Sequence, residues 1–440
     1  MKPQFLISSI GPGNGKTIFA MGLIHTLRKR GMKVQPYKCG PEITDTQLLT
    51  LSADNEVVNL DEWITTYTHI QHTYNKYGEK ADACIIEGNG ALFDGYKRMQ
   101  GSSAEIAKLL NVPVVLLVNA RMAGYSIASI IYGFKHFHPQ VKIVGVVFNQ
   151  ITSSAHYSYL KEACFDAGVD CLGYLPYNAE FKLPSKHSSI TLTTKRTMDT
   201  QINLIADDIE KNVNINRLLM NCNRNFPCQY TLPYSSDIEA ETVIPTSQQI
   251  KIAIARDPAF NFIYKENIAR LSIYGKISYF SPVYGSDLPE ADLIYLPGGY
   301  PELFARQLHR RHKLKNALKE YAEKGGKILA ECGGMAFLGR SITAKEGGTS
   351  YEMCNILPLD FTINSKLNSG YRKMIYNGVE LRGYEFHYSA TNNAENSLIA
   401  TQATNIKGTN VDLPLYRYKN IIASYGHWYW GDKDILDLWK

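Results

Sequence analysis

The chain reads Ile10-Gly11-Pro12-Gly13-Asn14-Gly15-Lys16-Thr17 where an apolar run over residues 4–10 gives way to helical spacing over residues 17–30. In loops of this kind, backbone N–H groups close around phosphate oxygens and the helix N-terminus adds a favourable field. The lysine reaches the outer phosphates, and the hydroxyl after it ligates magnesium. The strict pattern has glycine at position 10, so this loop is a variant. We expect a nucleotide to be bound by Gly11, Gly13, Asn14, Gly15, Lys16 and Thr17.

Strands and helices alternate around this loop. Buried parallel strands are continuous apolar runs in a sequence, and amphipathic helices repeat their apolar residues every three to four positions. The first half has such apolar runs at residues 4–10, 83–86, 112–118 and 143–148. Helical spacing occupies residues 17–30, 103–110 and 126–136. The repetition of strand, helix and strand predicts a doubly wound α/β sheet.

The alternation stops after Asp207 and returns near residue 250. Residues 210–249 are rich in Asn, Ser, Thr and Pro and lack both apolar periods, which is typical of a linker. New strand-like runs follow at residues 251–255, 276–280, 293–296 and 327–330. We therefore expect two α/β domains, over residues 1–209 and 250–440, joined by a linker over residues 210–249.

Length and composition limit the classes of function. A chain of 440 residues exceeds what one core usually supports. A net charge of +6 spread over this length does not suggest nucleic-acid binding, but it suits anionic small molecules. The longest apolar runs, of about seven residues, are too short for a membrane span of about 20. There is no Cys-x-x-Cys pair among the 8 cysteines and no signal-peptide layout, so we expect free thiols and a cytoplasmic location.

Acidic side chains follow several of the predicted strands. Glu87 ends one strand, Glu42 and Asp45 follow another, and Asp94 lies in a further glycine turn. Ligands of open α/β sheets bind at the carboxyl ends of the strands, and a magnesium nucleotide needs carboxylates there. For any one of these residues alone, a solvated loop charge is the alternative. Taken together, they predict a Mg²⁺ site formed by Thr17, Asp45 and Glu87.

A cysteine occupies a sharp turn in the second half. The strand-like run at residues 327–330 is followed by Glu331, Cys332, two glycines and helical spacing to Ile342. A nucleophile at such an elbow stands above the sheet edge, and a helix N-terminus lowers a thiol pKa toward the reactive thiolate form. This arrangement suits acyl transfer by Cys332. For the other seven cysteines we expect a buried structural role.

A second glycine turn and two histidines complete this candidate site. Gly298 and Gly299 follow the apolar strand at residues 293–296, and backbone N–H groups in such a turn are candidates for an oxyanion hole. Only two histidines follow the cysteine. His427 comes after a strand-like segment and is the expected base, while His387 is expected to orient the substrate.

Several further motifs accompany these sites in a fixed order. They are Gly15-Lys16-Thr17, Lys38-Cys39-Gly40-Pro41, Asn59-Leu60-Asp61, Glu87-Gly88, Asp94-Gly95, Arg256-Asp257, Ala259-Phe260-Asn261-Phe262, Phe280-Ser281-Pro282, Gly298-Gly299-Tyr300-Pro301-Glu302, Ala330-Glu331-Cys332-Gly333-Gly334 and Glu385-Phe386-His387. In this combination the chain resembles cobyrinic acid a,c-diamide synthases over nearly its whole length.

The resemblance implies a P-loop ATPase domain like that of dethiobiotin synthetase and a class I glutamine amidotransferase domain with a flavodoxin-type sheet. It implies ATP, Mg²⁺ and L-glutamine as cofactors and co-substrates, and a tetrapyrrole acid as substrate. Cys332 would attack the glutamine carboxamide with His427 as base. The first domain would phosphorylate a corrinoid carboxylate, which ammonia converts to an amide at side chains a and c. Substrate-contacting or supporting positions are Lys38, Glu42, Asp94, Gly298, Gly299 and His387.

The chain departs from the family pattern at several positions, and Leu183-Pro184-Ser185-Lys186-His187 is a weakened form of a further family motif. Glu42 and Asn119 stand where Asp is common, while Leu49 and Tyr429 stand where His is common. The third member of the amidotransferase triad is not placed by the sequence.

Three alternatives remain at this stage. One is amidation of another tetrapyrrole acid, such as a nickel-containing sirohydrochlorin. The second is a nucleotide-dependent switch of the partitioning-ATPase kind, and the third is a cysteine hydrolase with a regulatory ATP domain. The elbow cysteine argues against the switch, and the need to activate a carboxylate argues against the hydrolase. No nucleic-acid or membrane partner is expected, and a homodimer is left open.

Overall fold

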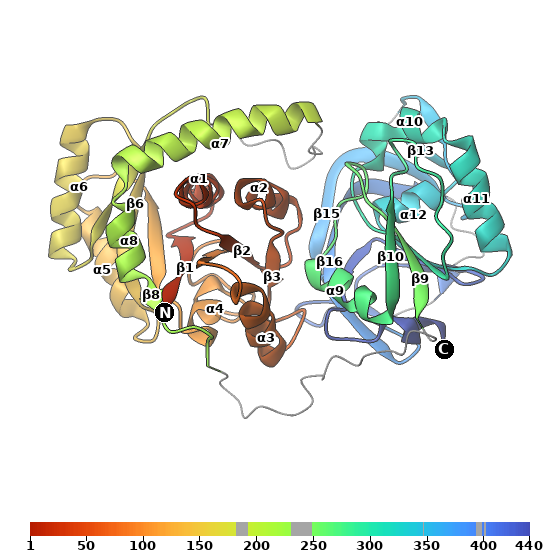
Figure 1. Ribbon diagram of the computed structural model, residues 1–440, viewed down its shortest axis with the longest axis horizontal. Coiled ribbons are helices and arrows are strands. Elements are labelled where there is room, and N and C mark those ends of the chain that lie inside the picture. The colour runs from red at the N-terminus through yellow and green to blue at the C-terminus, as the bar shows by residue number, and fades with distance from the viewer. Residues whose placement is uncertain (182–191, 230–248, 346, 393–397, 400–401) are drawn as a thin grey trace. The chain divides into compact units, whose positions relative to one another are not determined.

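A computed structural model describes residues 1–181, 192–229, 249–345, 347–392, 398–399 and 402–440 of the chain (Figure 1). These residues fall into two compact units, one before residue 230 and one after residue 248. Each unit buries an apolar core of its own. The expected α/β fold class is confirmed for both units.

The first unit is built on a parallel sheet with strand order β3-β2-β4-β1-β5-β6-β7. The strands are β1 (Lys2–Ser9), β2 (Val34–Cys39), β3 (Val58–Leu60), β4 (Ala83–Glu87), β5 (Val114–Asn119), β6 (Ile143–Ile151) and β7 (Cys171–Pro176). Strands β2, β3 and β4 are buried along their whole length, as expected for a parallel sheet that is covered on both faces. The carboxyl ends of β1, β2 and β4 therefore meet at one edge, where ligands of such sheets bind.

Helices cover both faces of this sheet (Figure 1). They are α1 (Lys16–Lys29), α2 (Thr44–Ala53), α3 (Tyr67–Gly78), α4 (Ser103–Leu109), α5 (Ile127–Phe137), α6 (Ser154–Asp166), α7 (Leu192–Asn212) and α8 (Ile215–Asn221). Helices α1, α2 and α7 lie together on one face, with α3 and α4 toward the other. Gly22 permits the close packing of α1 on α7, because a Cβ atom there would lie 2.4 Å from Ile205.

The prediction of a linker over residues 210–249 is wrong for residues 210–224, which form helices and a strand. Helix α7 continues to Asn212, α8 follows directly, and a short strand, β8 (Asn223–Arg224), pairs antiparallel with β1. Buried apolar residues of α7 and α8, such as Ile209 and Leu218, supply the reason, because they pack into the first unit. Their spacing is interrupted by many polar residues, which concealed the helices in the sequence. Residues 230–248 of the expected linker lie outside the described residues.

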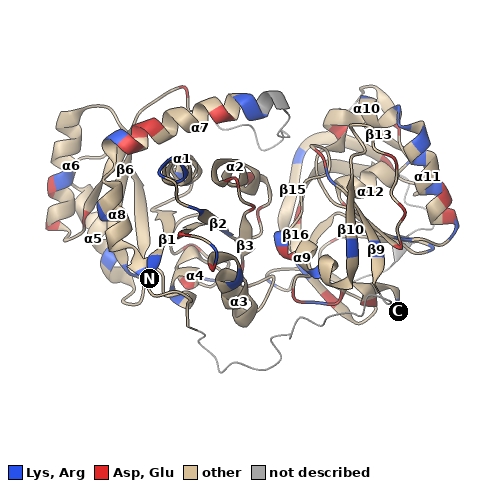
Figure 2. Ribbon diagram, in the orientation of Figure 1, with Lys and Arg blue, Asp and Glu red and all other residues tan. Residues whose placement is uncertain are grey.

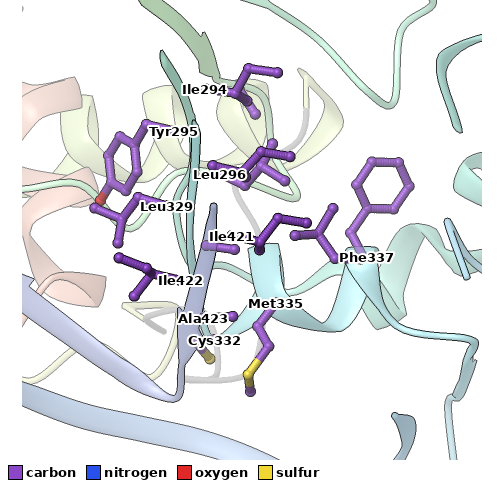
Figure 3. Close-up of a cluster of buried hydrophobic side chains, with 14 of the residues drawn as sticks. Ile294, Tyr295, Leu296, Leu329, Cys332, Met335, Phe337, Ile421, Ile422 and Ala423 are labelled. Atoms are coloured by element: carbon purple, nitrogen blue, oxygen red, sulfur yellow. The ribbon is translucent and has the colours of Figure 1, made fainter. Parts of the chain in front are cut away.

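The second unit has a central sheet with strand order β10-β9-β11-β12-β20-β19-β17. The strands are β9 (Ile250–Ala255), β10 (Gly275–Phe280), β11 (Leu293–Leu296), β12 (Lys327–Glu331), β17 (Leu398–Ile399), β19 (Leu415–Tyr418) and β20 (Ile421–Ser424). The five strands from β10 to β20 run parallel, β19 pairs antiparallel with β20, and β17 pairs antiparallel with β19. Figure 3 shows the apolar side chains of β11, β12 and β20 packed beside Cys332 and Met335.

A second sheet accompanies the central one, and the sequence analysis did not predict it. Its strand order is β14-β13-β15-β16-β21, with β18 paired to β15. The strands are β13 (Ser341–Thr343), β14 (Ser350–Glu352), β15 (Asp360–Tyr376), β16 (Val379–Asn392), β18 (Ala403–Asn405) and β21 (Gly426–Tyr429). The chain passes from β20 in the first sheet to β21 in the second within two residues, and β21 carries His427.

The helices of the second unit are short. They are α9 (Lys265–Tyr274), α10 (Ala305–His309), α11 (His312–Glu323) and α12 (Gly333–Leu338), with 3₁₀ turns at Pro301–Phe304 and Ile435–Trp439. The expectation that the helix after Cys332 continues to Ile342 is wrong. Gly339 ends it in an extended conformation, packed so closely on Phe361 that a Cβ atom would lie 2.7 Å from that ring. Ile342 belongs to β13 instead.

Helices α7 and α11 each carry charged residues of both signs (Figure 2). Among the described helices, none is long and apolar enough to cross a lipid bilayer.

Candidate active sites

The glycine-rich loop joins β1 to α1 in the first unit. Gly13 and Gly15 have φ angles of 72° and 91°, a region that glycine adopts without strain. Gly15 also approaches Asn149 so closely that a Cβ atom would lie 2.2 Å from its side-chain nitrogen. The Asn149 amide donates to the Asn14 carbonyl at 2.8 Å, and Asn14 Oδ1 accepts the Asn119 N–H at 3.0 Å. The loop is therefore anchored to the ends of β5 and β6.

Lys16 is the first residue of α1 and is buried. Its ammonium group donates to the Gly90 carbonyl at 2.5 Å and to the Ser9 hydroxyl at 3.0 Å. Burial lowers the pKa of Lys16, and the Glu87 carboxylate opposes this effect. The ammonium group thus lies between the ends of β1 and β4, at the sheet edge where the sequence analysis expected phosphates.

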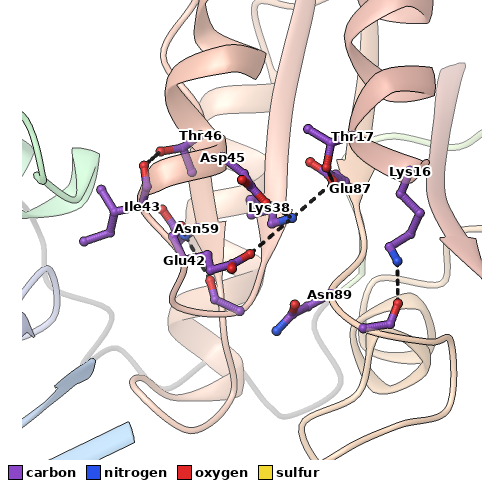
Figure 4. Close-up of polar contacts among 12 residues, drawn as sticks. Lys16, Thr17, Lys38, Glu42, Ile43, Asp45, Thr46, Asn59, Glu87 and Asn89 are labelled. Carbon is purple, nitrogen blue, oxygen red and sulfur yellow. Dashed lines mark hydrogen bonds and ion pairs between the residues drawn. The ribbon is translucent and has the colours of Figure 1, made fainter. Parts of the chain in front are cut away.

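Lys38 lies among three carboxylates at the same edge (Figure 4). Its ammonium nitrogen is 3.1 Å from Glu87, 3.7 Å from Asp45 and 3.8 Å from Glu42. Burial acts to lower the pKa of Lys38, but the three carboxylates outweigh it and raise the pKa well above the ordinary value. Lys38 was expected to contact or support the substrate, and the structure makes it the central cation of this cluster.

The residues expected to hold Mg²⁺ fit that ion. The Thr17 hydroxyl donates to Glu87 Oε1 at 2.6 Å. Asp45 and Glu87 both lie close to the ammonium group of Lys38. Glu87 Oε2 is buried and has no hydrogen-bond partner among the described residues. Hydroxyl and carboxylate oxygens are the ligands that Mg²⁺ prefers, usually only one or two from protein with the rest from phosphates and water. Among the described residues, no group of three or more His, Cys, Asp or Glu side chains is arranged to hold a metal ion.

Asp94 is placed differently from these residues. It lies exposed on the loop after β4, and its backbone N–H donates to the Ala91 carbonyl at 3.3 Å. Among the described contacts, none joins its side chain to the Lys38 cluster.

In the second unit, Cys332 stands at the elbow between β12 and α12. Its φ angle is 43°, which is rare for a residue with a side chain and marks a strained turn. Its N–H donates to the Ser424 carbonyl at 2.7 Å, and its sulfur lies 3.8 Å from the Phe386 carbonyl oxygen. Gly333 allows the elbow to approach the glycine turn, because a Cβ atom there would lie 2.8 Å from Gly299 O.

The surroundings of Cys332 favour the protonated thiol, contrary to the expected effect of the helix. Burial raises its pKa well above the ordinary value, and the nearby carboxylates of Glu302, Glu385 and Glu331 raise it further. The Gly333 N–H is the main opposing group. A helix of six residues does not outweigh burial among three acidic side chains.

His427 lies against the glycine turn in the same unit. A Cβ atom on Gly298 would lie 2.1 Å from the imidazole Cε1, and the Phe262 ring contacts the imidazole edge to face at 5.5 Å between centroids. Burial lowers the pKa of His427 to about 4, although the Phe386 carbonyl and Glu385 act in the opposite direction. The Phe386 carbonyl is close enough to act on the ring, but neither ring nitrogen forms a hydrogen bond of good geometry with a described residue. The lowered pKa favours the uncharged form of the ring.

His387 is held differently. Nε2 is 2.8 Å from Glu385 Oε1, Nδ1 is 2.7 Å from the Ser389 carbonyl, and the ring stacks on Tyr425 with 3.7 Å between centroids. The second carboxylate oxygen of Glu385 accepts a hydrogen bond from Arg372 Nε at 2.6 Å. Both imidazole nitrogens are therefore engaged, which makes His387 a poor base for the thiol.

A cavity opens beside Cys332, and His387 lines it. The other lining residues are Gly299, Tyr300, Pro301, Glu302, Gly333, Ala336, Ile342, Phe361, Ile363, Phe386, Tyr388 and Ser389. The structure thus brings together the elbow, the glycine turn and the Glu385-Phe386-His387 motif. The sequence analysis missed Glu302, Glu385 and Arg372 as charged groups of this site. Only Glu385 could have been found from the sequence, because it lies two positions before His387 and so shares a face of a strand with it.

Comparisons with known proteins agree with this division into two sites. Residues 5–190 match the family described as CobQ/CobB/MinD/ParA nucleotide binding domain. Residues 251–435 match the family described as CobB/CobQ-like glutamine amidotransferase domain.

Relatives that match over nearly their full length carry the name cobyrinate a,c-diamide synthase. One from Dehalococcoides mccartyi is 35% identical over 452 residues, which covers 98% of this chain and 95% of the relative. One from Sulfurisphaera tokodaii is 33% identical, and the match covers 97% of each chain. One from Priestia megaterium is 32% identical, and the match covers 97% of this chain and 94% of the relative. The chain belongs to the cobyrinate a,c-diamide synthase family. As a member of this family it is a glutamine-dependent ligase with a nucleotide-binding domain, and the resemblance drawn from the sequence motifs is confirmed.

Proposed function

We propose that the protein amidates the a and c acetate carboxylates of cobyrinic acid, using ATP and glutamine, in cobalamin synthesis. The observation that carries the proposal is a glycine turn, Gly298-Gly299, that packs against both the Cys332 elbow and the buried His427 ring, in a chain that also holds a phosphate loop. The names of the full-length relatives supply the substrate. Cytoplasmic location and the absence of nucleic-acid and membrane partners remain expectations from composition.

The first unit is proposed to activate the carboxylate. A carboxylate is a poor electrophile, so a phosphoryl group from ATP is transferred to one of its oxygens, giving an acyl phosphate and ADP. Lys16 and the loop N–H groups neutralise the charge on the phosphates. Lys38 is positioned to attract the anionic carboxylate, and Glu42 and Asp45 hold its ammonium group in place.

Mg²⁺ would be held by Thr17, Asp45 and Glu87 together with the phosphates, and its charge would favour attack at the outer phosphate. The buried unpartnered oxygen of Glu87 supports this assignment. Asp45 and Glu87 also contact Lys38, so the same two carboxylates would hold the ion and orient the lysine that attracts the substrate.

The second unit is proposed to release ammonia from glutamine. The Cys332 sulfur attacks the carboxamide carbon while the thiol proton passes to His427. That proton then moves to the leaving nitrogen, so that ammonia departs and a glutamyl thioester remains, which water hydrolyses to glutamate. The backbone at Gly299 and Gly333 is proposed to stabilise the oxyanion.

The two half-reactions complement one another. Ammonia is mostly protonated at neutral pH and is then not nucleophilic, so its release from glutamine in the same protein supplies the reactive form. Ammonia attacks the acyl phosphate carbon, phosphate leaves, and an amide results. Two rounds, one at each acetate side chain, consume two molecules of ATP and two of glutamine.

The experiment that tests the proposal is an amidation assay with ATP, Mg²⁺ and glutamine against a panel of tetrapyrrole acids. Mass spectrometry counts the amides formed on each acid. We expect two amides on cobyrinic acid and few or none on a nickel-containing sirohydrochlorin. If the preference were reversed, the substrate would be wrong. If folded protein amidated no acid but hydrolysed ATP, the switch alternative would replace the proposal.

A further inference from the structure

Strand β21, which carries His427, is held by a strand on one edge and by side chains on the other. One edge pairs with β16, where His427 lies opposite Tyr384. On the other edge, the peptide groups around Trp428 bond to two buried side chains, Glu331 and Asn267. These two residues come from separate elements, β12 and α9.

Glu331 links the strand of the base to the nucleophile. It is the last residue of β12 and directly precedes Cys332. Its Oε1 accepts the Trp428 N–H at 3.1 Å, and its Oε2 accepts the Tyr295 hydroxyl at 2.9 Å. Glu331 therefore bonds to the residue that follows His427 and is also the direct neighbour of Cys332 in the chain.

Asn267 completes the same edge. Its side-chain Nδ2 donates to the Trp428 carbonyl at 2.8 Å, and its Oδ1 accepts the Trp430 N–H at 2.9 Å. One amide side chain thus replaces the two hydrogen bonds that a neighbouring strand would provide. Glu331 and Asn267 are each only 1% exposed, so water does not compete for these bonds.

A buried peptide group without a partner is unfavourable, so β21 is held at the place where Glu331 and Asn267 satisfy it. The position matters because the His427 ring forms no hydrogen bond of good geometry with a described residue. Packing against Gly298 and Phe262 fixes the ring, while the hydrogen bonds to its strand fix the backbone.

We propose that Glu331 and Asn267 are positioning residues that hold the β21 backbone so that His427 faces the Cys332 thiol. The inference rests on the proposed function, in which His427 is the base. Neither residue touches glutamine in this role. Both act on the rate of ammonia release through the position of the imidazole.

The test uses substitutions of similar volume in the full-length protein. Glu331→Met and Asn267→Leu remove the hydrogen bonds and keep the space filled, while Glu331→Gln keeps an acceptor for Trp428 N–H. Asn420→Leu is the matched control, because Asn420 also bonds a backbone carbonyl, that of Gly325, but at the opposite end of β20. Ammonium-dependent amidation reports on the first unit in every variant.

We expect Glu331→Met and Asn267→Leu to lower kcat for glutamine hydrolysis about 100-fold, the effect of a base displaced by about 1 Å. KM for glutamine and the ammonium-dependent rate should change little. Glu331→Gln should recover activity to within about tenfold of the wild type, since an acceptor remains. Asn420→Leu should leave kcat for glutamine unchanged.

A double-mutant comparison separates positioning from a general loss of structure. If Glu331 acts through His427, Glu331→Met should cause no further loss of kcat in a His427→Ala background. An additional loss there, or full activity of Glu331→Met when His427→Ala is inactive, would overturn the inference. Full activity of His427→Ala would instead overturn the assignment of the base, and with it the proposed function of this site. If Glu331→Met does not fold, the same comparison is made with Asn267→Leu.

Discussion

The ammonium nitrogen of Lys38 lies 3.1 Å from Glu87, and both side chains are almost fully buried. Removing one partner of such a pair leaves a buried charge without compensation, which usually lowers the free energy of unfolding by about 3–5 kcal/mol. We expect this loss for Lys38→Met. The free energy of unfolding is measured by urea titration, and hydrogen exchange in β1 and β4 reports on this unit. Lys29→Met, which breaks an exposed pair with Asp207, should lower it by less than about 1 kcal/mol. Equal losses would show that Lys38 does not stabilise this cluster.

Lys16→Ala should abolish amidation with either nitrogen donor. Lys16 lies at the phosphate loop, and its charge is needed to activate the carboxylate before any ammonia reacts. The measurement is the rate of amide formation with glutamine and with ammonium chloride. Glutamine hydrolysis in the other unit should persist. A variant that lost only glutamine-dependent synthesis would contradict the role of the loop.

Cys332→Ala should abolish glutamine-dependent amidation and retain amidation from ammonium salts. The thiol is required only to form the thioester. Both rates are measured on the same preparation, together with glutamate release. Loss of the ammonium-dependent rate as well would show that Cys332 has a role beyond glutamine hydrolysis.

Gly298→Ala should lower the glutamine-dependent rate by about 100-fold or more, the scale expected when a general base is displaced. A Cβ atom at this position would lie 2.1 Å from the His427 ring, so the imidazole must move. The ammonium-dependent rate serves as the internal control. Wild-type kcat for glutamine in this variant would mean that the ring position does not limit the reaction.

The buried His427 should make stability depend on pH. An unfolded histidine takes up a proton near pH 6.5, whereas burial lowers the pKa of folded His427 to about 4. Between these values the unfolded state binds more protons, so the free energy of unfolding falls as pH decreases, by about 2 kcal/mol at pH 5. Urea unfolding at pH 7 and pH 5 should show this decrease in the wild type and a smaller decrease in His427→Leu. Equal decreases in both proteins would contradict the lowered pKa.

Several parts of the molecule could be predicted because local sequence determines them. The loop from Gly11 to Thr17 needs glycines at fixed positions to adopt its backbone angles, so its position between β1 and α1 is visible in the sequence. The elbow at Cys332 is marked by the glycines that follow it. Continuous apolar runs identified most parallel strands, since both faces of these sheets are buried.

Other parts depended on contacts between distant residues. The second sheet was missed because β15 and β16 are long, partly exposed strands whose alternation is weak. The end of α7 and the whole of α8 were assigned to a linker because α7 is rich in polar residues and α8 is short. The preference of Cys332 for the protonated thiol followed from burial among Glu302, Glu331 and Glu385, which outweighs the short helix.

By itself, the sequence determined the phosphate loop, the nucleophile elbow, the two α/β units and the family, because each depends on residue types at close spacing. Only the tertiary structure decided which charges meet. It placed Lys38 among Glu42, Asp45 and Glu87, joined Glu331 to the strand of His427, and left His387 bound on both ring nitrogens. Burial and partner geometry set protonation and orientation, and both arise only when residues far apart in the chain pack together.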